Sequence, residues 1–178
     1  MFEINRRRFL LTGAALSAAP FVGRINPAFA ASLTAGLIYV GPRDAYGYNQ
    51  AHAEGAAAIR DMEGLTLVEE ENVAESDAVV KTMESMIQLD GASLLFPTSF
   101  GYYNPFVVET ARQYSDVQFR HCGGLWSESD PKNAGSYFGY IGTAQYICGI
   151  IAGHMSKSKK LGFVAAKPIP QVLLNINA

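Results

Sequence analysis

Aromatic, hydroxyl and amide side chains gather in the loops that follow apolar, strand-like runs of this sequence. Four loops are involved, at residues 41–49, 98–104, 121–126 and 166–168, and few of their side chains are charged. The seven candidate ligand-binding residues are Tyr46, Tyr48, Asn49, Ser99, Phe100, Tyr102 and Trp126. Aromatic faces beside hydrogen-bonding groups suit a flat polar ligand such as a heterocyclic base, whose faces stack on rings while its edges form hydrogen bonds.

Each candidate also has a purely structural interpretation. Tyr46 and Tyr48 can pack across the start of the next helix, and Asn49 is of a type that caps helices. Phe100, Tyr102 and the adjacent Tyr103 cannot all face one pocket, so at least one belongs to the core or the surface.

Signatures of catalysis are missing from the sequence. It contains no G-x-S-x-G nucleophile elbow, no phosphate loop ending in Gly-Lys-Ser or Gly-Lys-Thr, and no G-x-G-x-x-G after the first strand. The acidic run 69–71 is typical of a solvated turn. His52, His121 and His154 show no metal-ligand spacing. We therefore expect neither catalytic residues nor a metal or cofactor.

These loops depend on elements that alternate along the chain between short β-rich runs and longer helical ones. The pattern predicts strands at 33–40, 65–69, 91–96, 117–121 and 160–165. It predicts helices at 48–62, 74–89, 105–114 and 142–155, a loop at 123–139, and a further helical segment at 168–176. Strand and helix in turn indicate an α/β fold with a doubly wound parallel sheet, which binds ligands at the carboxyl ends of its strands.

Composition excludes several classes of protein. The chain has 178 residues, of which 49% are hydrophobic and 17% charged, so it is neither disordered nor collagen-like. The first 30 residues are net basic, because Arg6, Arg7, Arg8 and Arg24 are accompanied by a single acid, Glu3. The remainder is net acidic, which argues against nucleic acid or an anionic membrane surface as a partner.

The first 30 residues have the parts of a secretory signal peptide: basic residues, an apolar run at 9–22, and Ala28-Phe29-Ala30 before the expected cleavage site. The run is shorter than the roughly 20 residues that cross a bilayer. The start at 5–10, Asn-Arg-Arg-Arg-Phe-Leu, resembles a twin-arginine export signal, and an ordinary secretory leader is the alternative. In an oxidising compartment Cys122 and Cys148 can pair, although both also suit roles as small buried hydrophobes.

Several segments resemble the basic membrane protein (BMP) family, the PnrA-like substrate-binding components of ABC importers, which include purine-nucleoside-binding proteins. They occur in the family's order, from about Leu33 to the last residue. They are 39–42 (Tyr-Val-Gly-Pro), 48–52 (Tyr-Asn-Gln-Ala-His), 97–102 (Pro-Thr-Ser-Phe-Gly-Tyr), 137–139 (Tyr-Phe-Gly), 149–153 (Gly-Ile-Ile-Ala-Gly), 168–170 (Pro-Ile-Pro) and 176–178 (Ile-Asn-Ala).

The resemblance implies a type I periplasmic binding protein fold, with two α/β lobes that close on a ligand. Residues 1–30 are then the signal peptide, 31–166 a nearly complete first lobe, and 167–178 the start of a second lobe that is mostly missing, so we expect a truncated chain. Tyr48 is the expected stacking residue, followed by the polar Asn49, and 99–102 lines the same cleft.

The resemblance further implies a periplasmic protein that binds a purine nucleoside or nucleobase and delivers it to an ABC permease. The first loop departs from the family, since 43–48 reads Arg-Asp-Ala-Tyr-Gly-Tyr where many relatives have Gly-Asp-Gly-Gly-Trp. Alternatives are a binding protein for a sugar or other small polar solute, a ligand sensor, and a nucleoside hydrolase.

Overall fold

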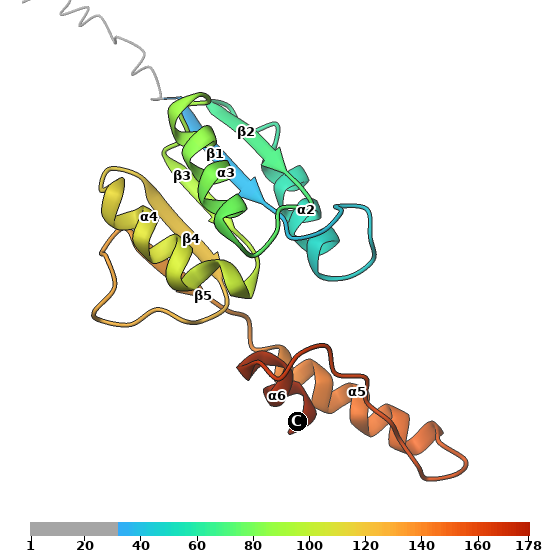
Figure 1. The fold of residues 1–178 in the computed structure, drawn as a ribbon. Coiled ribbons are helices and arrows are strands. Elements are labelled where there is room, and N and C mark those ends of the chain that lie inside the picture. Colours follow the sequence, from blue (N-terminus) through green and yellow to red (C-terminus); the bar gives the residue numbers. More distant parts are fainter. Residues whose placement is uncertain (1–31) are drawn as a thin grey trace, which may run out of the picture. The chain divides into compact units, whose positions relative to one another are not determined.

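The computed structural model describes residues 32–178, and the expected signal peptide lies outside them. Its centre is a five-stranded sheet in which every neighbouring pair is parallel (Figure 1). The strands are β1 (Leu33–Ile38), β2 (Leu65–Glu70), β3 (Leu94–Pro97), β4 (Gln118–Cys122) and β5 (Ala134–Tyr137). The predicted α/β class and parallel sheet are confirmed.

The strand order is β2-β1-β3-β4-β5, so β1 lies between β2 and β3. After β1 the chain adds β2 on one side of it, and then β3, β4 and β5 in order on the other side. Such a reversal opens a crevice at the carboxyl ends of the two strands, where open α/β sheets bind their ligands. The loops that begin at Gly41 and Thr98 border this crevice.

Side chains of the central strands alternate between the two faces of the sheet, as the two-residue period of a strand requires. Ile38 and Leu95 belong to the larger core cluster, which also contains buried residues of α3 (Asp77–Gln88) and α4 (Val108–Gln113). Leu37, Tyr39 and the partly buried Phe96 pack on the opposite face with Ala56 of α2 (Tyr48–Ile59). Helices therefore cover both faces of the sheet around β1 and β3.

The position of α3 is fixed by its start and by its apolar face. The Ser76 hydroxyl accepts a hydrogen bond from the backbone N–H of Ala78 at 3.3 Å, which caps the first turn. Val79, Met83 and Met86 recur at helical spacing and are almost wholly buried. A side chain at Gly36 would lie 2.6 Å from the Met86 sulfur, so glycine on β1 allows the helix to approach the strand.

Three predicted elements are wrong in type or extent. Residues 105–114 do not form one helix: the chain passes through a 3₁₀ turn (η1, Phe100–Tyr102) and a π-helical turn (η2, Tyr103–Val107) before α4 begins. The expected loop at 123–139 contains β5. The expected strand at 160–165 is irregular and exposed, because no strand of the described sheet lies beside it to complete its hydrogen bonds.

The last two helices are α5 (Ile141–Met155) and α6 (Pro170–Ile176), close to the predicted 142–155 and 168–176. They contact each other, yet α5 contributes no buried residue and α6 contributes Gln171 alone. Among residues 32–178, no helix combines the length and the apolarity needed to cross a membrane.

Candidate functional site

The Tyr48 side chain joins loops from three parts of the sequence. Its hydroxyl donates to the Thr98 carbonyl oxygen, just beyond β3, and lies 3.5 Å from the carbonyl oxygen of Cys122, at the end of β4. Burial of this hydroxyl raises the pKa of Tyr48. The ring packs edge-on against His52, with centroids 4.6 Å apart, and 45% of the residue stays exposed. Tyr48 therefore presents an aromatic surface at the carboxyl edge of the sheet.

Asn49 is placed beside Tyr48 by the start of α2. A side chain at Gly41 would lie 2.7 Å from the amide nitrogen of Asn49, so the glycine leaves the space that Asn49 occupies. The Asn49 side chain does not cap the helix. Its Oδ1 atom is buried and has no hydrogen-bond partner among the described residues, so the residue that follows Tyr48 keeps an unused amide acceptor.

Ser99 is held by a residue that the sequence interpretation missed, Glu75. Glu75 Oε1 accepts hydrogen bonds from the Ser99 hydroxyl at 2.6 Å and from the Gly101 backbone N–H at 3.0 Å. Its other oxygen pairs with Lys167 Nζ at 3.1 Å. The hydrogen bond from Ser99 is the main reason that the pKa of Glu75 lies below its ordinary value. A single ionised carboxylate thus fixes the loop after β3.

His121 is a second residue that the sequence interpretation left without a role. It is fully buried in β4, where Nε2 lies 2.8 Å from the Ser99 carbonyl oxygen and Nδ1 lies 2.8 Å from the Ser136 hydroxyl. Because a carbonyl only accepts, Nε2 carries the proton and Nδ1 accepts from Ser136. Burial lowers the pKa of His121 to about 4, against weaker opposing effects of backbone hydrogen bonds. The neutral ring therefore links β4, β5 and the loop after β3.

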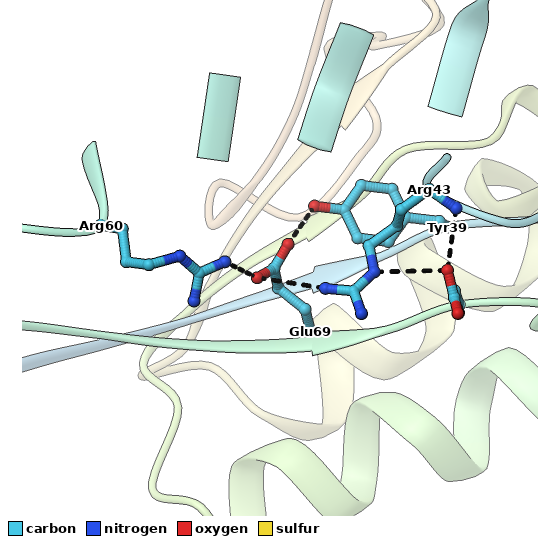
Figure 2. Close-up of polar contacts among 5 residues, drawn as sticks. Tyr39, Arg43, Arg60 and Glu69 are labelled. Atoms are coloured by element: carbon cyan, nitrogen blue, oxygen red, sulfur yellow. Dashed lines mark hydrogen bonds and ion pairs between the residues drawn. The ribbon is translucent and has the colours of Figure 1, made fainter. Parts of the chain in front are cut away.

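The first loop is tied to the sheet by a polar cluster around Glu69 (Figure 2). Glu69 Oε1 accepts from the hydroxyl of the buried Tyr39 at 2.8 Å, while Oε2 pairs with Arg60 and, at 3.4 Å, with Arg43. Arg43 also donates to Glu71 through its backbone N–H at 2.8 Å and through Nε at 3.3 Å. The expected solvated turn at 69–71 is thus wrong for Glu69, whose side chain is 6% exposed.

Electrostatics in this cluster favour the ionised carboxylate. Burial by itself would raise the pKa of Glu69, but hydrogen bonds from Tyr39 and Arg60 and the charges of Arg60 and Arg43 lower it overall. Burial and the same carboxylate raise the pKa of Tyr39. Arg43 sits in the loop between β1 and α2, so the cluster holds the segment that leads to Tyr48.

The remaining candidate residues from the sequence differ in how exposed they are. Trp126 is half exposed in the loop after β4, and Phe100 is partly buried in η1. Tyr46 is 98% exposed. Tyr102 offers no surface to a ligand, because it is fully buried and its hydroxyl donates to the Val73 carbonyl oxygen at 2.6 Å.

Neither a disulfide nor a metal centre is formed by the described residues. Cys122 is buried and Cys148 exposed, and both thiols are free. Within residues 32–178, no three His, Cys, Asp or Glu side chains are grouped so that they could hold a metal ion. The edge of the crevice therefore carries the aromatic ring of Tyr48, the hydroxyl of Ser99 and the amide of Asn49.

Comparison with known proteins shows which family the chain belongs to. The profile of the family Bmp, described as ABC transporter substrate-binding protein PnrA-like, matches residues 32–178. The chain belongs to this family. Its members are substrate-binding proteins, and the resemblance noted from the sequence is confirmed.

Two curated relatives carry different ligand names. The chain is 33% identical over 150 residues to a purine-binding protein of Brucella abortus, covering 82% of this chain and 41% of the relative. It is 31% identical over 154 residues to a putative ABC transporter glucose-binding protein of Haloferax volcanii, covering 86% of this chain and 38% of the relative. The chain thus spans about 40% of the length of these relatives.

A solved structure supports the fold of this Bmp-family chain. A solute-binding protein of an ABC transporter system from Aeropyrum pernix superposes with a TM-score of 0.64 at 22% identity. The match covers 80% of this chain and 40% of that one. At this identity the match concerns the fold, which is that of a solute-binding protein.

Proposed function

We propose that this chain contributes the first lobe of an exported ABC-importer binding protein for a purine nucleobase or nucleoside. The ligand would lie at the carboxyl edge of β1 and β3, stacked on Tyr48, with Asn49 and the Ser99 loop at its edges. The partner would be the permease of the importer, in the inner membrane. The site residues proposed are Tyr48, Asn49, Ser99, Phe100 and Trp126, with Tyr46 at the outer rim.

One observation carries this proposal: the hydroxyl of Tyr48 is tied to Thr98 while almost half of the residue stays exposed. A ring held at its polar end and free on its surface is suited to stacking, because little further ordering is needed when a flat ligand binds. The purine-binding name of one curated relative supports the same ligand class.

A titration with purines and sugars tests the proposal. Adenine, adenosine and guanosine should each shift backbone amide resonances of residues 41–50 and 98–104 in ¹H–¹⁵N NMR spectra, and they should raise Tm as binding to the folded state requires. Glucose at equal concentration serves as the comparison. Resonance shifts with glucose alone would contradict the purine assignment.

A sugar is the second candidate, and it is favoured by the name of the second curated relative. Hydroxyl groups of a hexose can pair with Asn49 and Ser99, and the nonpolar face of a pyranose can pack on Tyr48. A nucleoside hydrolase is a weaker alternative, for which incubation with adenosine and chromatography of the products would reveal cleavage.

Export by the twin-arginine pathway is the remaining part of the proposal, and it places the mature chain in the periplasm. Replacing Arg6 and Arg7 with Lys should prevent processing at Ala30 in cells whose general secretory pathway is intact. Mature protein still present in the periplasm would show that the leader uses the general pathway instead.

A further inference from the structure

The buried residue of α6 is an amide rather than an apolar side chain. Gln171 is 9% exposed, whereas Leu173, Leu174 and Ile176 of the same helix are each about half exposed. Burying an amide while apolar neighbours stay in water does not help a helix to pack, since polar groups cost free energy on burial unless they are paired. The Gln171 side chain is therefore held by specific polar contacts.

The orientation of the Gln171 amide follows from its one partner. Nε2 donates to the carbonyl oxygen of Gly123. That oxygen can only accept, so the amide nitrogen must face it and Oε1 points elsewhere. Oε1 is buried and finds no hydrogen-bond donor within residues 32–178. Buried acceptors in folded proteins are almost always paired, so Oε1 requires a donor that the described residues do not supply.

Gln171 reaches the same edge of the sheet as Tyr48. Its partner Gly123 follows Cys122, whose carbonyl oxygen lies beside the Tyr48 hydroxyl. Four residues before Gln171, Lys167 pairs with Glu75, the carboxylate that holds Ser99. The segment 167–171 is thus attached at one end to Glu75, which holds the loop after β3, and at the other end to Gly123, in the loop after β4.

The unpaired buried atoms share one chemical type, which indicates the kind of partner group that they require. In the described part of the chain, three buried side-chain atoms lack a partner: Asn49 Oδ1, Gln171 Oε1 and Asn175 Oδ1. All three are amide oxygens, which accept hydrogen bonds and carry no charge. Asn175 follows Gln171 by one helical turn, so both lie on one side of α6. Each such oxygen can pair with an N–H donor of a neutral ligand, whereas an anion supplies no donor.

We infer that Gln171 is a ligand-contacting residue of the proposed site, where Oε1 accepts a hydrogen bond from an N–H group on the edge of a heterocyclic base. This rests on the proposed function, because it deepens the description of the same site. Tyr48 then recognises the face of the base from the first loop, and Gln171 recognises its edge from α6.

The test uses two bases that differ in one group. Adenine carries an amino group on its six-membered ring and purine carries none. Fluorescence of Trp126, the single tryptophan, and NMR titration of the full chain both measure the two dissociation constants. The unmodified chain should bind adenine about 10-fold more tightly than purine, as expected for one hydrogen bond to a buried acceptor. In Gln171→Met the preference should fall below about 2-fold, with purine affinity nearly unchanged.

Gln113→Met is the matched control, since Gln113 is exposed at the end of α4 and lies outside the site. It should retain the full preference for adenine. An unchanged preference in folded Gln171→Met would overturn the role of Gln171 and leave the proposed function intact. If the unmodified chain bound neither base, the proposed function would fail, and this inference with it.

A second variant applies if circular dichroism shows that Gln171→Met does not fold. Gln171→Asn keeps an amide with one donor and one acceptor but withdraws both by one methylene, so it should lose most of the preference for adenine. An undiminished preference for adenine in a folded Gln171→Asn variant would overturn the inference.

Discussion

Nε2 of His121 lies 2.8 Å from the carbonyl oxygen of Ser99, so a buried strand residue is bonded to the loop that borders the crevice. Ser136 binds the other ring nitrogen and also accepts from the Leu125 backbone N–H at 2.9 Å. The arrangement uses a neutral imidazole with one donor and one acceptor. Protonation would make both ring nitrogens donors and place a charge in the core.

The free energy of unfolding should therefore fall as the pH decreases from about 6.5 to about 4. Above the ordinary pKa of 6.5, His121 is neutral in both states. Below pH 6.5 His121 binds a proton in the unfolded chain, whereas in the folded chain it stays neutral until about pH 4. The free energy of unfolding therefore falls throughout this window. The full loss would be about 3 kcal/mol. Urea unfolding at several pH values measures it.

His52 has to be separated from His121, because burial also lowers its pKa. His121→Gln should remove most of the loss between pH 6.5 and 5, whereas His52→Gln should leave most of it in place. Carboxylates such as Glu69 and Glu75 contribute at lower pH, since their pKa values are depressed from 4.5. An unaltered pH profile in His121→Gln would refute the role assigned to the imidazole.

Substitutions at Tyr48 should separate its two roles. Tyr48→Phe keeps the ring but removes the donor to the Thr98 carbonyl, so we expect a loss of about 1 kcal/mol in stability and little change in stacking. Tyr48→Ala should also weaken adenine binding more than about 10-fold, as expected when a stacked base loses its platform. Tyr140→Ala is the control, because Tyr140 is 94% exposed. Equal adenine affinity in Tyr48→Ala and Tyr140→Ala would argue against stacking on Tyr48.

Loss of the Glu75 carboxylate should release the loop after β3. Glu75→Ala removes the acceptor for Ser99 and Gly101, and we expect it to lower the free energy of unfolding by about 2 kcal/mol at pH 7. Lys167→Met should cost at most about 1 kcal/mol, because the Lys167 side chain is 65% exposed. Glu128→Ala, at an exposed loop position, is the control. A larger loss in the free energy of unfolding for Lys167→Met than for Glu75→Ala, measured by denaturant unfolding, would contradict this account.

Removing the Tyr39 hydroxyl should lower the free energy of unfolding more than removing the hydroxyl of an exposed tyrosine. Tyr39→Phe removes the hydrogen bond to Glu69 in a fully buried residue, with an expected loss of about 2 kcal/mol. Tyr114→Phe makes the same chemical change where the phenol accepts from Gln88 at an exposed site, and it should cost less than about 0.5 kcal/mol. Similar urea midpoints for the two variants would show that the Glu69 cluster does not depend on Tyr39.

The sequence predicted the sheet well because its signals are local. Apolar runs such as 33–38 and helical spacing such as Val79, Met83 and Met86 are visible in one segment at a time. The prediction at 160–165 failed because a strand also needs a neighbour, which local pattern does not supply. Residues 134–137 were overlooked, since a strand of four residues among Gly, Asn and Ser has little apolar signal.

The candidate site was predicted in part for a similar reason. The loops after β1, β3 and β4 follow from strand order, so Tyr48 and Ser99 were found. Glu75 lies 24 residues from Ser99 in sequence, and nothing near it indicates that contact. His121 did leave a signal: it follows Phe119 by two residues, which places a polar ring on the apolar face of a strand. Such a residue needs buried partners, here Ser99 and Ser136.

The order of the strands also bears on self-association. The outer strands of the described sheet are β2 and β5, whose free edges are potential templates for another chain. The carboxyl end of β2 carries Glu69 and Glu70, and β5 is only 4 residues long. Charged or very short outer strands are poor partners for further pairing. The exposed Glu70, next to the acid that holds the first loop in place, thus discourages two copies of the sheet from joining edge to edge.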